Sequence, residues 1–240
     1  MGNIDNQRPW AVLPVKAIKN SNSRLTPILS TTDRQQLSLS MLEDVLDVLE
    51  NTSDLGGVVI ITNCPIVKKC LSKLDVIHLE EGNRPELNSA ITKAVRFLRD
   101  MGIQRFFTIP GDVPLLNSSE INQLIEFVRS NEGVTLVPSH DGAGTNSIAS
   151  SIPIQFSSQF GDNSLSAHCR IAKDLGLSVQ ILPLSGLGFD IDWPDDLIQL
   201  ASMNSDSKSH RVLNNIDLVQ RRNRLRRLDN SDTTRIERLI

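Results

Sequence analysis

The sequence predicts an α/β protein, with a single Rossmann-like domain in which a mostly parallel sheet carries helices on both faces. Short apolar or β-branched runs alternate with longer segments whose apolar residues recur at helical spacing. This alternation is typical of parallel sheets, because each crossover back to the next strand needs a connection such as a helix. The length of 240 residues suits one core of this kind.

The apolar runs predict buried strands at residues 10–15, 58–61, 76–79, 105–109 and 134–137. Helical spacing of apolar residues predicts helices that include residues 37–49, 90–98 and 121–128. Thr32-Asp33-Arg34-Gln35 fits a capping box at the start of the first helix. Ligands of such sheets bind beyond the carboxyl ends of the strands, so we expect a site where the predicted strands end.

The chain is predicted to divide into a domain at residues 1–203 and a basic polar tail at residues 204–240. The tail is rich in arginine between residues 221 and 227 and has little apolar surface to bury, which indicates a flexible segment or an edge helix. A solvated tail is a more common explanation of such a charge run than contact with RNA.

Composition and charge indicate a cytoplasmic globular protein. The net charge of -3, with 22% charged and 39% hydrophobic residues, gives no reason to expect nucleic acid or a membrane as a partner. We find no apolar run long enough to span a bilayer and no secretory signal in residues 1–10. The spacings of Cys64, Cys70 and Cys169 predict reduced thiols instead of a disulfide framework or a zinc site.

Three aspartates are the candidate ligands of a metal ion. Asp190 and Asp192 lie two residues apart, so both carboxylates face the same side of an extended segment. Asp112 follows the predicted strand at 105–109, at its carboxyl end. Hard oxygen ligands with open positions for phosphate are what Mg²⁺ requires. Each motif alone is weak: an Asp-x-Asp pair is more often a surface or capping pair, and Asp112 is equally compatible with a turn.

Two basic residues are candidate partners of phosphate groups. Lys16 and Arg24 lie on the polar loop after the first predicted strand. Lysine supplies a point charge and arginine a bidentate fork, and both suit a triphosphate. The loop lacks the glycines and the Gly-Lys-Ser/Thr ending of a Walker A motif.

Two glycine-rich segments, 141–146 and 160–164, are candidate anion sites. Glycines let backbone N–H groups approach an anion closely, and Thr145 and Ser164 add hydroxyl donors. Such segments are more often plain turns. His168 would share a helix face with Ser164, although a lone histidine is more often a packing residue than a catalyst.

Together, these motifs resemble the phospholactate guanylyltransferase family of coenzyme F-420 biosynthesis. The resemblance covers residues 10 to 200 approximately and rests on the following segments: Pro14-Val15-Lys16, Ser23-Arg24-Leu25, Leu87-Asn88, Asp112-Val113-Pro114, Gly144-Thr145-Asn146, Gly161-x-x-Ser164-x-x-x-His168 and Asp190-Ile191-Asp192-x-Pro194-x-Asp196-Leu197.

The resemblance implies a fold of the nucleotide-diphospho-sugar transferase type and a magnesium-dependent enzyme. The enzyme would join the GMP part of GTP to a phosphorylated three-carbon acid, namely 2-phospho-L-lactate, phosphoenolpyruvate or 3-phospho-D-glycerate, and release pyrophosphate. A homodimer is compatible with the resemblance, and a downstream transferase would receive the labile diphosphate product.

The resemblance also assigns roles to residues. Asp112, Asp190 and Asp192 would hold Mg²⁺, and Lys16, Arg24 and Asp112 would act in catalysis. The residues assigned to GTP are Lys16, Arg24 and Asn88. The residues assigned to the acid are Thr145, Gly161 and Ser164.

The chain departs from the family pattern at Asn22, where a lysine is usual, and at Glu86, where glycine is usual. Asn22 would remove one phosphate cation, and Lys19 is a candidate substitute on the same loop. Two other functions stay open. One is another nucleotidyltransferase of the same fold, acting on a molybdenum cofactor or a sugar phosphate, although those families usually begin with a glycine-rich Leu-x-Gly-Gly segment. The other is a binding-only paralogue.

Overall fold

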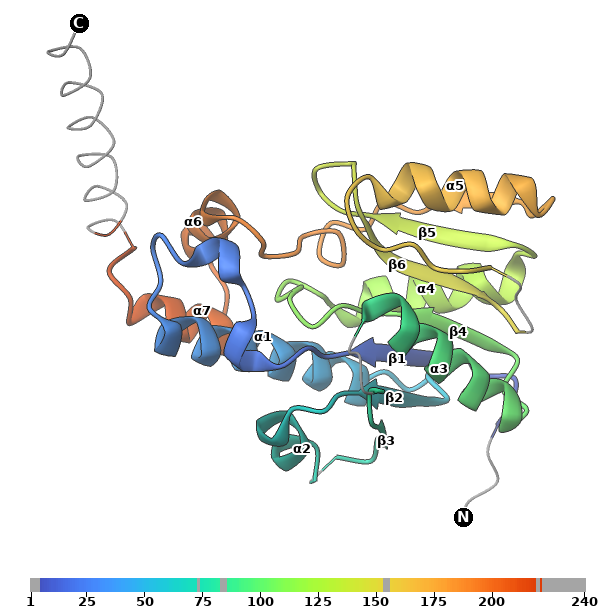
Figure 1. Cartoon of the computed structure of the whole chain (residues 1–240), viewed down its shortest axis with the longest axis horizontal. Helices are drawn as coiled ribbons and strands as arrows, with labels where there is room; N and C mark the ends of the chain where they lie inside the picture. The colour runs from blue at the N-terminus through green and yellow to red at the C-terminus, as the bar shows by residue number, and fades with distance from the viewer. Residues whose placement is uncertain (1–4, 73, 83–85, 153–155, 219–220, 222–240) are drawn as a thin grey trace, which may run out of the picture.

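The computed structural model describes residues 5–72, 74–82, 86–152, 156–218 and 221 (Figure 1). Within these residues one seven-stranded sheet has the order β3-β2-β1-β4-β6-β5-β7. Neighbouring strands are parallel, except that β6 runs antiparallel to β4 and to β5. The predicted α/β class and mostly parallel sheet are confirmed. The strands are β1 (Trp10–Pro14), β2 (Gly57–Ile61), β3 (Ile77–Leu79), β4 (Arg105–Thr108), β5 (Val134–Pro138), β6 (Thr145–Ser151) and β7 (Val179–Ile181).

Helices cover both faces of the sheet, as the alternation predicts (Figure 1). Alternate residues of each strand face opposite sides, so Ala11 and Leu13 of β1 join one core and Trp10 and Val12 join another. The first core contains side chains of α1 (Thr31–Glu50), α2 (Pro65–Leu71) and α4 (Ser118–Ser130). The opposite face is covered by α3 (Leu87–Asp100) and α5 (Ser164–Asp174).

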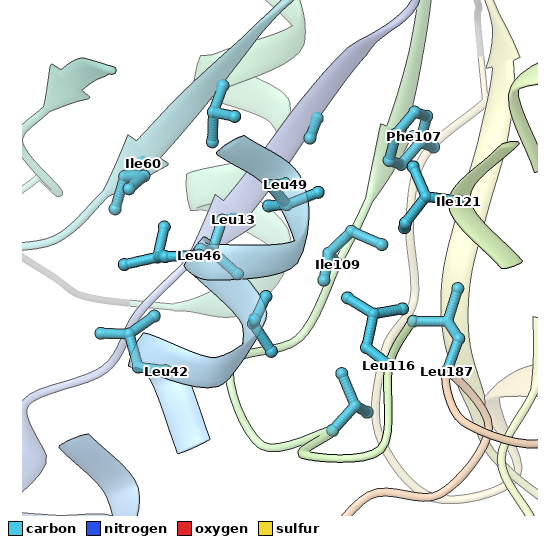
Figure 2. Packing of buried hydrophobic residues seen from close by; sticks show 14 of the residues in the cluster. Leu13, Leu42, Leu46, Leu49, Ile60, Phe107, Ile109, Leu116, Ile121 and Leu187 are labelled. Carbon is cyan, nitrogen blue, oxygen red and sulfur yellow. The ribbon is translucent and has the colours of Figure 1, made fainter. Parts of the chain in front are cut away.

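The first helix begins at a different cap from the predicted one. The hydroxyl of Ser30 accepts from the N–H of Asp33 (3.1 Å), and the Asp33 carboxylate accepts from the N–H of Ser30 (3.1 Å). This capping box lies two residues before the predicted one at Thr32, since Ser30 keeps the extended backbone that a cap requires. The predicted apolar stripe is present, and Leu42 and Leu46 pack on the strands (Figure 2).

A second, smaller core lies beyond the carboxyl ends of β1 and β4 (Figure 1). It combines side chains from the first half of α1, from α6 (Pro194–Ser202) and from α7 (Lys208–Asn214) with side chains from the loop between β1 and α1. This loop contains two short 3-10 turns. The turns are η1 (Ile18–Asn20) and η2 (Ser23–Leu25), of which η2 contributes Leu25. We call this cluster the second core; its buried members are Leu25, Ile28, Leu29, Leu37, Met41, Phe189, Ile191, Leu197, Leu200, Leu213 and Leu218.

The start predicted for the polar tail, at residue 204, does not coincide with a loss of packing. Leu213 and Leu218 are 2% and 7% exposed in the second core. The backbone N–H groups of Lys208 and Ser209 donate to the carboxylate of Asp44 in α1 (2.7 and 2.9 Å). Residues 205–218 therefore pack against the domain, while residues 219–220 and 222–240 lie outside the described residues.

The sequence does not predict β6, because it places a glycine-rich loop at residues 141–146. The strand begins at Thr145 and is rich in small polar residues, so it lacks the β-branched run by which the other strands are recognised. Within the described residues, no helix is both long and apolar enough to cross a membrane.

Candidate active site

The peptide group of Ile191 joins three segments that are distant in the sequence. Its N–H donates to the carbonyl of Asp112 (3.0 Å), and its carbonyl accepts from the side-chain amide of Asn22 (2.9 Å). The Ile191 side chain is fully buried in the second core. Asp190 and Asp192 flank this anchored residue, so the structure brings the three candidate aspartates to the carboxyl end of β4.

The aspartates form a cluster of negative charge that favours a cation. Burial, together with the charges of Asp190 and Asp192, raises the pKa of Asp112 to about 7, although the positive charge of Lys16 opposes this shift. Burial and the charge of Asp190 also raise the pKa of Asp192. A positive ion beside these carboxylates would favour their ionised forms.

Arg24 is paired with one of these aspartates. Its guanidinium forms an ion pair with Asp192, and the guanidinium carbon lies 4.8 Å from the ring centroid of Trp193. The Trp193 side chain is 56% exposed, so this cation–π contact lies at the surface. A triphosphate would therefore have to compete with Asp192 for the charge of Arg24.

The donor set suits magnesium in its chemistry, although the ligands are not preassembled. Carboxylate oxygens are the hard ligands that Mg²⁺ prefers, and a cation would favour the ionised form of Asp112, whose pKa is raised by burial and by the neighbouring carboxylates. In the described part of the chain, however, no three His, Cys, Asp or Glu side chains are grouped closely enough to hold a metal ion. A cation would compete with Arg24 for the Asp192 carboxylate.

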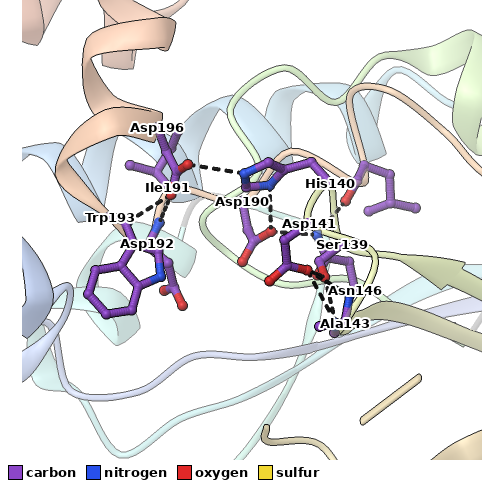
Figure 3. Close-up of polar contacts among 12 residues, drawn as sticks. Ser139, His140, Asp141, Ala143, Asn146, Asp190, Ile191, Asp192, Trp193 and Asp196 are labelled. Atoms are coloured by element: carbon purple, nitrogen blue, oxygen red, sulfur yellow. Dashed lines mark hydrogen bonds and ion pairs between the residues drawn. The ribbon is translucent and has the colours of Figure 1, made fainter. Parts of the chain in front are cut away.

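His140 lies between two aspartates and is a site residue that the sequence does not reveal (Figure 3). Its Nε2 atom is 3.0 Å from Asp196 Oδ1, and its Nδ1 atom is 3.6 Å from Asp190 Oδ1. The amide of Asn146 also donates to Asp190 Oδ1 (3.0 Å). These contacts orient the Asp190 carboxylate. The position of His140 just after the predicted strand at 134–137 is the signal that could have found it.

Asp196 has a capping role, as expected for an acid at a helix start. Its Oδ2 atom accepts from the N–H groups of Asp192 (3.1 Å) and Trp193 (2.8 Å). Asp196 is 7% exposed. It fixes the direction in which the chain passes from Asp192 into α6.

Glu120 anchors the loop that leads to Asp190, and the sequence does not reveal this either. Its buried carboxylate accepts from the N–H groups of Gly186 (2.6 Å) and Leu187 (2.9 Å). The backbone approaches so closely there that a Cβ atom on Gly186 would lie 2.2 Å from the carbonyl oxygen of Leu115. Any side chain at position 186 would therefore displace this loop.

The residues assigned to the acid lie together at the start of α5. The N–H of Thr145 donates to Ser164 Oγ (2.9 Å), and the N–H of Ser164 donates to the carbonyl of Gly161 (3.2 Å). Gly161 has φ of +142°, which favours glycine. The hydroxyl groups of Thr145 and Ser164 are able to donate to an anion, so this group, which we call the acid subsite, has suitable chemistry.

Asn88 does not lie free to contact a nucleotide. Its carbonyl oxygen accepts from the N–H of Phe160 (2.9 Å), and its amide donates to the Phe160 carbonyl (3.4 Å). Both ends of the side chain are therefore used to hold the loop before Gly161. This arrangement places Asn88 beside the acid subsite.

The glycine-rich segment at 141–146 begins with a closed turn. Asp141 accepts from the N–H groups of Ala143 (2.9 Å) and Gly144 (3.3 Å), and its hydrogen bond from Ser139 lowers its pKa. These backbone donors already have a carboxylate partner. The turn is therefore not a phosphate-binding loop, and the contribution of the segment comes from Thr145 and Asn146.

Asn22 has a structural role in the position where the resemblance predicts a lysine. It adopts the left-handed conformation (φ 51°, ψ 43°), which asparagine tolerates better than most residues. Its side chain donates to the Ile191 carbonyl (2.9 Å) and accepts from the hydroxyl of Ser38 (2.7 Å). Asn22 thus connects the loop of Arg24 to the segment of Asp190 and Asp192.

The fold is of the nucleotide-diphospho-sugar transferase type. A solved structure from Desulfovibrio desulfuricans, assigned as a nucleotide-diphospho-sugar transferase, has the same fold, with a TM-score of 0.71 and 16% identity over 88% of this chain and 96% of that chain. The family model "Guanylyl transferase CofC like" matches residues 10–230. The chain belongs to this guanylyltransferase family, which confirms the prediction from its motifs.

Relatives with three different names resemble the chain to the same degree. The phosphoenolpyruvate guanylyltransferase of Conexibacter woesei is 29% identical over 81% of this chain and 87% of its own length. The 3-phospho-D-glycerate guanylyltransferase of Colwellia psychrerythraea is 30% identical over 81% and 91%. The 2-phospho-L-lactate guanylyltransferase of Methanothermobacter thermautotrophicus is 30% identical over 78% and 81%. Overall identity therefore does not select one acid.

Proposed function

We propose that this protein transfers GMP from GTP to a phosphorylated three-carbon acid and releases pyrophosphate, as a step in coenzyme F-420 biosynthesis. The candidate acids are phosphoenolpyruvate, 2-phospho-L-lactate and 3-phospho-D-glycerate, which the names of the relatives specify. The observation that carries the proposal is the family match, together with the aspartates gathered around the Ile191 peptide.

The reaction is a direct in-line displacement. A phosphate oxygen of the acid attacks the α-phosphorus of GTP, a new P–O–P bond forms, and pyrophosphate leaves. The acid subsite holds the acceptor, and Lys16 and Arg24 neutralise charge on the triphosphate. This chemistry depends on positioning and on charge neutralisation, and it needs no covalent intermediate.

Asp112, Asp190 and Asp192 would hold magnesium, which supplies positive charge to the phosphates when bound. Arg24 would then move from Asp192 to the triphosphate, so one arginine serves both states of the site. We further propose that the protein is cytoplasmic and forms a homodimer. A downstream transferase would receive the labile diphosphate product.

Pyrophosphate release tests the proposed reaction. The purified full chain is incubated with GTP, Mg²⁺ and each acid separately, with the downstream transferase present as a trap for the product. We expect release with one acid and much less with ATP or CTP in place of GTP. Release with none of the three acids would contradict the proposed substrate class.

The assignment of Asp190 and Asp192 is tested with Asp190→Asn and Asp192→Asn, which keep the shape of the side chain. We expect each to reduce kcat/KM by about 10²-fold or more, because an amide does not neutralise the cation. Asp174→Asn, at an exposed position on α5, is the matched control. Normal turnover of both site variants at limiting Mg²⁺ would contradict the metal assignment.

A further inference from the structure

His168 lies beneath the acid subsite and contacts two of its segments. The residue is 0% exposed and sits one helical turn after Ser164 in α5. Its Nε2 atom is 2.8 Å from the N–H of Gln159, and its Nδ1 atom is 3.0 Å from Thr145 Oγ1. His168 therefore connects the loop before Gly161, the start of β6 and α5.

These two contacts define the tautomer of the ring. The backbone N–H of Gln159 is a donor only, so Nε2 must accept and carries no proton. Burial lowers the pKa of His168 to about 4, which keeps the imidazole neutral near pH 7. The remaining proton is then on Nδ1, and Nδ1–H donates to the hydroxyl oxygen of Thr145.

This tautomer controls the direction of the Thr145 hydroxyl. Because Thr145 Oγ1 accepts from His168, its own proton points elsewhere, and no acceptor for it is found among the described residues. Ser164 has the same character, since its Oγ atom accepts from the N–H of Thr145. Thr145 and Ser164 are 5% and 2% exposed. A buried hydroxyl proton without an acceptor is costly, so the pair favours a ligand that only accepts hydrogen bonds.

We propose that His168 is a positioning residue of the acid subsite: through its Nδ1–H group it directs the Thr145 hydroxyl proton toward the bound acid. Phosphate and carboxylate oxygens are acceptors, so either group suits these two hydroxyl donors. This inference rests on the proposed function, because it assigns the acid to this subsite. His168 acts through Thr145 and takes no part in the displacement.

Two substitutions separate the contacts of the ring. His168→Asn places an amide near the Nδ1 position, so it retains a donor for Thr145 and loses the contact with Gln159. His168→Gln reaches the Nε2 position, so it retains an acceptor for Gln159 and loses the donor to Thr145. Each variant removes one of two hydrogen bonds, so we expect similar losses of thermal stability.

The two variants should differ in their kinetics. We expect His168→Gln to raise the KM for the acid by about 10-fold, with the KM for GTP changed by less than about 2-fold, and His168→Asn to raise the acid KM by less than about 3-fold. The effects of His168→Gln and Thr145→Val should be non-additive in the double variant. Equal acid KM values in the Asn and Gln variants, or a matching rise in the KM for GTP, would overturn the proposal.

A second measurement does not depend on the folding of the variants. Nitrogen-15 spectra of the wild-type imidazole should show a protonated Nδ1 and an unprotonated Nε2 near pH 7, and the opposite tautomer would overturn the proposal.

The kinetic assays use phosphoenolpyruvate, 2-phospho-L-lactate and 3-phospho-D-glycerate in turn. Wild type that is inactive with all three contradicts the proposed function, whereas active wild type with indistinguishable variants contradicts only the role of His168.

Discussion

Asn22 shows why a departure from a family motif needs its structural context. The sequence predicts that its change from lysine removes a cation, and restoring the lysine would then strengthen GTP binding. The structure predicts the reverse, because Asn22 is left-handed and bridges Ile191 and Ser38. Lysine would lose both hydrogen bonds and strain the backbone, at a cost of about 2–4 kcal/mol.

We therefore expect Asn22→Lys to lower the melting temperature by about 5–10 °C and to reduce kcat/KM for GTP. Ser23→Lys is the matched control, because it adds the same charge at the adjacent exposed position. Thermal unfolding and GTP kinetics of the two variants show whether the added charge or the lost hydrogen bonds dominate at position 22. An Asn22→Lys protein of normal stability with tighter GTP binding would show that charge outweighs the bridge.

Asp112 makes the stability of the metal-free protein depend on pH. Its pKa is raised from 3.8 to about 7 in the folded state, so the folded state binds more protons than the unfolded state between these values. The contribution of Asp112 to the free energy of unfolding therefore falls as pH rises through this window. Above pH 7, ionised Asp112 destabilises the folded protein. In EDTA at pH 8, Asp112→Asn should stabilise the protein by roughly 1–2 kcal/mol, after allowance for partial exposure.

Urea unfolding at pH 4 and pH 8 measures this effect, and the advantage of Asp112→Asn should nearly vanish at pH 4. Asp174→Asn, on the surface, is the matched control. We expect Asp112→Asn to lose about 10²-fold or more of its activity at the same time. A variant that is less stable than wild type at pH 8 would show that the carboxylate is not a source of repulsion.

At the scale of elements, α7 supports the site although it lies after the last motif. Leu213 and Leu218 fill the second core, which also holds Leu25 and Ile191 beneath Arg24 and the aspartates. We expect a chain that ends at Ser205 to lose about 3–5 kcal/mol of stability, because it lacks two buried leucines and the two hydrogen bonds that the start of α7 donates to Asp44.

A chain that ends at Arg221 is the matched control, since it keeps α7 and the ion pair of Arg221 with Asp33. Thermal unfolding should show a melting temperature about 10 °C lower for the shorter chain, with loss of nucleotidyl transfer, and near-normal values for the longer one. Full activity of the shorter chain would show that α7 is dispensable for nucleotidyl transfer.

At the scale of the whole molecule, the site lies between the main sheet core and the second core. Asp112 is carried by the end of β4, whereas Arg24, Asp190 and Asp192 are carried by segments that are anchored in the second core. A ligand that contacts both sides should oppose their separation. At 100 times its Kd, GTP with Mg²⁺ should stabilise the protein by about 2.7 kcal/mol.

Thermal unfolding with GTP should therefore show an increase of about 5–10 °C in the presence of Mg²⁺. EDTA or Asp190→Asn should remove most of this increase. If GTP in EDTA stabilises wild type as strongly as GTP with Mg²⁺, the nucleotide binds without the aspartates and the metal.

The sequence by itself determined the α/β class, most strand and helix positions in the first half of the chain, and the guanylyltransferase family. These follow from local periodicity and from motif residues, which are visible without knowledge of contacts. Only the tertiary structure decided the roles of Asn22, Asn88, His140 and Glu120, the strand β6 and the packing of α7. Their roles depend on hydrogen bonds or apolar contacts with partners far along the chain, as in the Asn22–Ile191 pair, 169 residues apart, and no local pattern specifies such partners.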